Sequence, residues 1–404
     1  MSLIRAPRRY WTQSVLFLAT LGAAGMWSVS FSTVLRAHHL ESLIAYALAW
    51  TALAAFAAPL IAGGLADQRI PPERLLRWLT MGAAVFLALG FCAIEFTWGT
   101  GAVLGFFLLH SLCNTPVYSI LSAVIFADLP DAAGGFARVR VWGTVGWALG
   151  GWLVSWGLRA DNSTLSGFAA AAVLFGTGVG LGGLRETRPP DEKPRRSWRE
   201  VLGWDALSLF RQHDHRAVLL VTILFCIPLA AFTPFTPLHL RALGFEHPTA
   251  TMTLGQVGEI ICMVWLASVL RRFRLKWIFL AAIALAVVRY GLFTLDTRGA
   301  VLAGIALHGF CYTLFFITAQ VYMAERIDLT MRARAQSLFF LIYSGVGNFT
   351  GYLATGWWKV ACMTGTETNW RNYWGGLCVT TMAVGLYFLA SYSGVGRGSR
   401  RAED

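Results

Sequence analysis

The side chains best able to do chemistry in this sequence stand inside long apolar stretches, where polar groups are costly. Arg140, Thr144 and Trp147 follow one another at i, i+4 and i+7, so they share one face of a helix. A guanidinium, a hydroxyl and an indole on one face can bind a polar or anionic solute with a planar part. The alternative is a basic residue at a membrane surface followed by ordinary helix packing.

A second polar pair, Gln256 and Glu259, lies three positions apart on one helical face. Ile260 and Ile261 follow directly, and a carboxyl in apolar surroundings favours its neutral form. Such a group can accept and release a proton within one working cycle, which makes Glu259 the first candidate for proton coupling. The alternative is a structural ion pair, with Arg289 as its partner.

A third group lies in another apolar stretch, where His308 and Tyr312 share a helical face and Thr313 stands beside them. An imidazole gains and loses a proton near physiological pH, so His308 is the second candidate for proton coupling. A hydrogen-bonded packing histidine is the alternative. Arg289 must pair or face water, and a structural salt bridge is favoured for it. Lesser binding candidates include Tyr118, Thr233 and Tyr343.

The elements that must position these groups are apolar stretches of roughly 20 residues, the length that crosses a bilayer core. A polar linker at 185–214 separates an N-terminal half, 1–184, from a C-terminal half, 215–404. Six spans precede the linker and six follow it, the layout of two parallel repeats. We therefore predict an all-α integral membrane protein of twelve transmembrane helices in two six-helix pseudo-repeats. The predicted spans are 10–35, 41–65, 75–94, 100–127, 140–158, 165–184, 215–243, 249–270, 277–295, 300–325, 334–362 and 373–393.

Composition and the placement of charge support a membrane protein and give its orientation. Charged residues make up 13% of the chain and mean hydropathy is +0.57, whereas soluble domains carry about 25% charged residues. Basic residues are retained on the cytoplasmic side of a membrane. We therefore expect an inner (plasma) membrane protein with both termini cytoplasmic, and membrane lipid as its surroundings. The linkers that follow odd-numbered spans would lie outside the cell, and they contain few basic residues. Of the 33 Lys and Arg, those in or beside these linkers are Arg36, Arg159, Arg241, Arg298, Lys359 and Arg371.

Several classes of function are disfavoured. The net charge of +12 is spread over separate linkers with no basic groove, so no nucleic-acid partner is predicted. The seven cysteines contain no C-x-x-C and no metal-ligand spacing, and we expect neither metal nor cofactor. The sequence lacks G-x-S-x-G, H-E-x-x-H and a P-loop, which argues against an enzyme and against an ATP-driven pump. A gradient, most simply of protons, is then the expected energy source.

Small residues four positions apart occur in several predicted spans. They are Gly146 and Gly150, Gly176 and Gly180, Gly178 and Gly182, and Gly347 and Gly351. This spacing lets two helix backbones approach closely in lipid. It fits either a contact that slides during function or static packing.

The sequence resembles the major facilitator superfamily, and within it the nucleoside:proton symporter family. The resemblance covers nearly the whole chain. The similar segments are GGLADQRIPPERL at 63–75, VRVWGTVGW at 139–147, SWREVLGWDALSLF at 197–210, QVGE at 256–259, VVRYGLF at 287–293 and MRARAQSLFFLIYSGVGNFTGYLATG at 331–356.

The resemblance implies a proton-coupled symporter of a small polar solute, a nucleoside, that works by alternating access with substrate held near mid-membrane between the halves. The family's cavity pattern falls on Arg140, Thr144, Trp147, Gln256 and Glu259. The sequence departs from it at three places: Ala230 and Thr233 stand where the family has amides, and Thr313 falls where nucleoside transporters have a membrane aspartate.

These departures leave alternatives open, because a site built on hydrogen bonds discriminates strongly by them. A retuned transporter could carry an aromatic carboxylate or a sugar. A sensor that has lost transport is a further alternative, and a polytopic membrane enzyme is disfavoured by the absence of catalytic motifs. We expect a monomer whose partners are a small-molecule substrate and protons.

Overall fold

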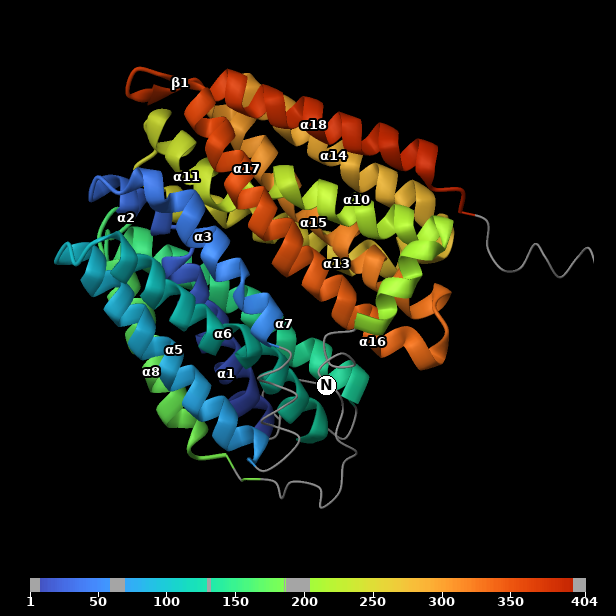
Figure 1. Cartoon of the computed structure of the whole chain (residues 1–404). Helices are drawn as coiled ribbons and strands as arrows, with labels where there is room; N and C mark the ends of the chain where they lie inside the picture. Colours follow the sequence, from blue (N-terminus) through green and yellow to red (C-terminus); the bar gives the residue numbers. More distant parts are fainter. Residues whose placement is uncertain (1–7, 59–69, 129–131, 185, 187–203, 395–404) are drawn as a thin grey trace, which may run out of the picture. The chain divides into compact units, whose positions relative to one another are not determined.

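The computed structural model describes residues 8–58, 70–128, 132–184, 186 and 204–394 (Figure 1). The turn at 63–69, most of the linker at 185–203 and both chain ends lie outside these residues. Within the described residues, nine helical stretches are long and apolar enough to cross a membrane. Strand structure there is confined to a hairpin in which β1 (Met363–Thr364) pairs antiparallel with β2 (Glu367–Thr368). The predicted all-α membrane fold is confirmed.

The three predicted spans beyond these nine are helical but are shorter or interrupted. The fifth is α7 (Ala132–Trp152) followed by a π-helical turn, η3 (Leu153–Gly157). The sixth, α8 (Leu165–Leu181), has 17 residues. The eleventh is divided by the π-helix η5 (Leu341–Gly347), and π-helical turns inside α-helices often occur at functional sites.

The chain divides into two compact units. The first contains Met1–Arg196 together with Thr233–Thr253, and the second contains Ser197–Phe232 and Leu254–Asp404. The division into pseudo-repeats at 184 and 215 remains a prediction. Besides α7, η3 and α8, the first unit contains α1 (Arg8–Trp27), α2 (Phe31–Ala37), η2 (Glu41–Leu43), α3 (Ile44–Ala52), α5 (Pro72–Glu95), α6 (Thr100–Asp128), nearly all of α11 (Phe232–Ala242) and α12 (Pro248–Met252).

Helix α7 lies directly against α1, and glycines make the approach possible. A side-chain carbon at Gly146 would overlap the backbone carbonyl of Leu18, and one at Gly150 would overlap that of Gly22. In α8, by contrast, Gly176 faces open space. The spaced glycines of α7 therefore lie in a contact between two helices. Gly176 of α8 has the same spacing but lies in no helix contact.

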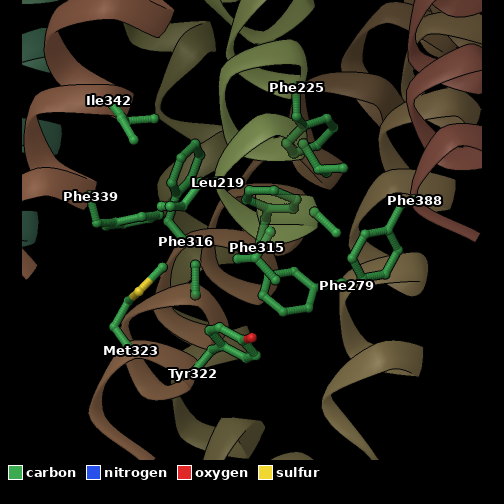
Figure 2. Packing of buried hydrophobic residues seen from close by; sticks show 14 of the residues in the cluster. Leu219, Phe225, Phe279, Phe315, Phe316, Tyr322, Met323, Phe339, Ile342 and Phe388 are labelled. Carbon is green, nitrogen blue, oxygen red and sulfur yellow. The ribbon is translucent and has the colours of Figure 1, made fainter. Parts of the chain in front are cut away.

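The second unit contains the remaining helices and has an aromatic core. In Figure 1 its helices α14 and α18 lie side by side. Figure 2 shows Phe225, Phe315, Phe279 and Phe388 packed together; the Phe225 and Phe315 ring centroids are 4.4 Å apart. The elements are η4 (Trp204–Arg211), α10 (His213–Ala230), α13 (Leu254–Arg272), α14 (Leu275–Thr294), α15 (Arg298–Arg326), α16 (Leu329–Phe340), η5, α17 (Asn348–Ala361), the hairpin and α18 (Trp370–Ser391).

Local sequence explains where several helices begin and end. Asn369 caps α18, where its side chain accepts a hydrogen bond from the Asn372 backbone N–H at 3.0 Å. The seventh predicted span breaks after Ala230, because Pro234 has no N–H to donate to the Ala230 carbonyl. The chain passes from the second unit to the first just beyond this break, at Thr233.

A buried carboxylate joins two segments of the first unit that are distant in sequence. Asp161 Oδ1 accepts hydrogen bonds from Ser155 Oγ and from the Thr249 backbone N–H, each at 2.9 Å. Ser155 Oγ in turn accepts from the Ala250 N–H at 2.9 Å. The start of α12 therefore has its free N–H groups satisfied by side chains of the segment after α7.

We expect Asp161→Ala to destabilise the protein by about 1–3 kcal/mol, because it leaves buried donors without an acceptor. Asp161→Asn keeps an oxygen at the same place and is expected to lose less. Thermal unfolding of the purified variants, followed by intrinsic fluorescence, measures the difference. An Asp161→Ala variant that unfolds at the wild-type temperature would contradict this assignment.

Candidate functional site

In the first unit, the face of α7 predicted to bind solute begins with Arg140. Its side chain is half-buried, and its Nε donates a hydrogen bond to the Tyr118 hydroxyl of α6 at 2.6 Å. The guanidinium carbon lies 5.7 Å from the centre of the same ring. Tyr118 therefore fixes one edge of the guanidinium, and no hydrogen bond to the described residues holds the two terminal nitrogens.

Thr144 and Trp147 continue this face one and two turns further along α7. Thr144 is buried and Trp147 is half-buried. The α7 backbone at Trp147 touches α1 so closely that a side-chain carbon at Gly25 would overlap it. The position of Trp147 is therefore set by the packing of α1 on α7. The structure brings Arg140, Thr144 and Trp147 together on one helix, as their spacing predicts.

Thr233 belongs to the same unit and is half-buried at the helix break after Ala230. Within the described residues it makes no hydrogen bond to Arg140 or Thr144. Broken helices in transporters commonly line substrate sites, because their free backbone groups can bind a solute. This position keeps Thr233 a candidate.

In the second unit, Gln256 and Glu259 lie on α13, and both are half-buried. Val257, Ile260, Ile261 and Val264 of the same helix are exposed, so an apolar surface lies beside the polar pair. The packed side of α13 meets α15 with the two backbones in contact. A side-chain carbon at Gly309 of α15 would overlap the backbone nitrogen of Glu259. The helix crossing therefore fixes the backbone that carries the carboxyl.

His308 lies beside this crossing and is bonded to Arg289 of α14. Arg289 Nη1 is 2.6 Å from His308 Nδ1, and the imidazole stacks on the Phe232 ring with centroids 3.7 Å apart and planes at 10°. Arg289 is fully buried, with its guanidinium carbon 4.3 Å from the centre of the Tyr290 ring. The sequence predicts that Arg289 must pair, but nothing in it identifies His308 as the partner.

Tyr312 and Thr313 complete the group on α15. The hydroxyls of Tyr312 and Tyr343 are 3.0 Å apart, and Tyr343 belongs to the π-helix η5. Thr313 is buried, and its hydroxyl has no hydrogen-bond partner within the described part of the chain. The structure thus gathers His308 and Tyr312 with the polar pair of α13, while Thr313 lies in the packed interior.

Two features of the site escape sequence reasoning. Phe232 forms the stacking surface for His308, although it lies in a different span. Gly309 and Gly258 allow α13 and α15 to cross at Glu259, since a side-chain carbon at Gly258 would overlap the Ala306 carbonyl. Both depend on helices that meet only in the folded protein, so no spacing within one helix signals them.

Long apolar helices that carry an arginine, a carboxyl and an imidazole at interior positions are typical of polytopic membrane transporters. The comparison with known families gives the finer class. The sequence model of the family described as Nucleoside H+ symporter matches residues 12–393, and the chain belongs to that family.

Several Escherichia coli (strain K12) proteins are similar in sequence. The protein named Putative nucleoside transporter YegT is 29% identical over 366 residues, which cover 84% of each chain. The xanthosine permease is 24% identical over 371 residues, covering 87% of this chain and 88% of the permease.

The fold is shared with a solved transporter. The crystal structure of the nucleoside transporter NupG matches with a TM-score of 0.85 at 20% sequence identity, covering 96% of this chain and 100% of the other. This likeness confirms the predicted major facilitator type of architecture.

Proposed function

We propose that this protein couples the movement of a nucleoside to that of protons by alternating access, with substrate contacts supplied by both halves of the chain. Family membership supports the proton-coupled nucleoside class. The observation that carries the proposal at the level of residues is the polar group on α13 and α15, where Glu259 stands at a helix crossing next to His308 and Tyr312. Ionisable groups at such depth are retained for function.

The first unit would supply contacts to the polar edge of the substrate. Arg140 is held by Tyr118, so its guanidinium is oriented before a ligand arrives. Thr144 can donate to or accept from a hydroxyl, and the indole of Trp147 offers a face for a planar base. Thr233 would add a hydroxyl from the helix break.

The second unit would supply amide and carboxyl contacts and the proton. Gln256 can both donate and accept, which suits a nucleobase edge or a ribose. Glu259 would carry the proton, with His308 as the other candidate. Tyr312 and Thr313 take part as hydroxyl donors. No cofactor is required by this scheme.

The same proposal includes orientation and state of assembly. The distribution of Lys and Arg supports an inner (plasma) membrane location with both termini cytoplasmic. Membrane lipid surrounds the exposed apolar side chains, such as Val264 at 72% and Trp265 at 65% exposure. A monomer is sufficient, because each chain carries both sets of candidate contacts.

Uptake by the purified protein in liposomes tests the proposal. With the outside more acidic than the inside, labelled uridine is expected to accumulate above its external concentration, and a protonophore is expected to abolish that excess. Unlabelled nucleosides should compete with uridine, whereas benzoate and glucose should not. Competition by benzoate or glucose, with none by nucleosides, would overturn the nucleoside assignment in favour of the carboxylate or sugar alternative.

A further inference from the structure

The bond between Arg289 and His308 determines which nitrogen of the imidazole carries hydrogen. A guanidinium has only donors and keeps its charge in proteins, so it cannot accept a hydrogen bond from a ring N–H. At 2.6 Å from Arg289 Nη1, the His308 Nδ1 must therefore be the acceptor. A neutral imidazole whose Nδ1 accepts carries its hydrogen on Nε2.

A second consequence is that His308 cannot be protonated while this bond exists. A proton on Nδ1 would set two donors and two positive charges face to face. The Arg289 side chain is fully buried, and its Nε and Nη2 have no hydrogen-bond partner within the described residues. Rings of Tyr290 and Phe232 flank the guanidinium with centres at 4.3 and 5.2 Å.

The remaining nitrogen of His308, Nε2, is not used in a hydrogen bond within the described residues. The His308 side chain is only half-buried. The imidazole plane is fixed by its stack on Phe232 at 3.7 Å. The ring thus presents one N–H donor in a fixed direction.

We propose that Arg289 is a positioning residue that holds His308 as a neutral Nε2–H donor, and that this donor binds an acceptor oxygen or nitrogen of the substrate. The proposal deepens the transport function and rests on it for the identity of the bound molecule. It also removes His308 from the two candidates for proton coupling, which leaves that role to Glu259.

The charged and titratable groups around His308 agree with this role. From α14 it faces Arg289, and on its own helix the Tyr312 ring lies with its centroid 6.1 Å away. From α13 it faces the segment of Gly255 and Glu259, where a side-chain carbon on Gly255 would lie 3.5 Å from the imidazole. Phe232 of α11 contributes no charge. Arg289 is therefore the only permanent cation in direct contact with the ring within the described residues.

Nuclear magnetic resonance of protein labelled with ¹⁵N-histidine tests the tautomer without any substrate. The signal lost in His308→Gln identifies His308. Between pH 5 and 8 we expect His308 to keep Nε2 protonated and Nδ1 bare. Titration of His308 within this pH range, or hydrogen on Nδ1, would overturn the proposal.

Variants of Arg289 separate its charge from its shape. Arg289→Lys keeps the cation and should leave His308 neutral. Arg289→Gln can still donate but removes the charge, so protonation of His308 should become easier. In uptake assays, Arg289→Gln is expected to lose more activity at acid pH than wild type does, because the buried imidazole no longer faces a positive charge. In the double variant that combines Arg289→Gln with His308→Gln, this loss of activity at acid pH should disappear. Arg289→Gln and wild type with the same pH profile would contradict the assignment.

The substrate contact has its own measurement. His308→Phe keeps the stacked ring without the donor and should raise KM for uridine roughly tenfold, the loss expected for one hydrogen bond. His308→Gln, which returns an N–H, should recover part of it. If wild type transports no nucleoside, the resonance experiment still decides the tautomer, so failure of the transport function and failure of this inference are distinguishable. An unchanged KM in His308→Phe would reject the substrate contact.

Discussion

Glu259→Gln is expected to abolish proton-driven accumulation of nucleoside in proteoliposomes, so that uptake stops at the external concentration. The amide has nearly the same size and can form hydrogen bonds, but it cannot take up or release a proton at physiological pH. Exchange of labelled for unlabelled nucleoside across the membrane needs no net proton movement, and it should continue. Loss of accumulation with exchange preserved is the signature of a coupling group.

A matched control is Glu367→Gln in the exposed hairpin, where the same chemical change should have no effect. Initial uptake, accumulation ratio and counterflow exchange are measured for both variants against wild type. Undiminished uphill uptake by Glu259→Gln would reject the coupling role. Loss of both accumulation and exchange would instead assign Glu259 to substrate binding alone.

The fold could be predicted because its strongest determinants are local. Apolar stretches of membrane length and the alternation of basic linkers are visible in the sequence, and both reflect the cost of moving charge into lipid. Interruptions are harder to place. The break after Ala230 has a signal in Pro234, but the π-helical turns η3 and η5 have no marker in the residues that form them.

Only the parts of the site that lie on one helix could be predicted from the sequence. The spacing of Arg140, Thr144 and Trp147, or of Gln256 and Glu259, is a property of helical periodicity. The bond from Arg140 to Tyr118 and that from Arg289 to His308 join different helices. Such pairs depend on which helices pack together and on the level in the membrane at which their residues meet. A hydropathy pattern gives no information on either point.

The glycines illustrate the same limit. In sequence, Gly176 and Gly180 have the spacing of a packing motif as clearly as Gly146 and Gly150 do. In the structure the first pair faces open space and the second lies against α1. Gly309 has no glycine four positions away on its own helix, yet it permits the closest approach at the site. The facing helix decides whether a missing side chain matters.

Gly309→Ala is therefore expected to have the largest structural effect of any single-carbon change near the site. The added carbon would overlap the Glu259 nitrogen, the Gly255 carbonyl and the Gly258 carbonyl carbon, all of them backbone atoms of α13. Side chains can rotate away from such an overlap, but a helix backbone can only move as a whole. We expect a loss of about 1–3 kcal/mol or more, as for other overpacked interiors, and displacement of the carboxyl of Glu259.

Gly291→Ala of α14 is the control, because its side-chain carbon would meet nothing within 4 Å. Alanine there should stabilise the helix by about 0.5–1 kcal/mol, since it is a better helix former than glycine. Unfolding temperature and accumulation ratio of the two variants are compared at equal protein density in liposomes. A Gly309→Ala variant that folds but accumulates no nucleoside would show that the crossing positions Glu259, since the carboxyl itself is unchanged. If both variants match wild type in stability and accumulation, α13 and α15 do not meet at this residue, and the placement of Glu259 beside His308 has to be abandoned.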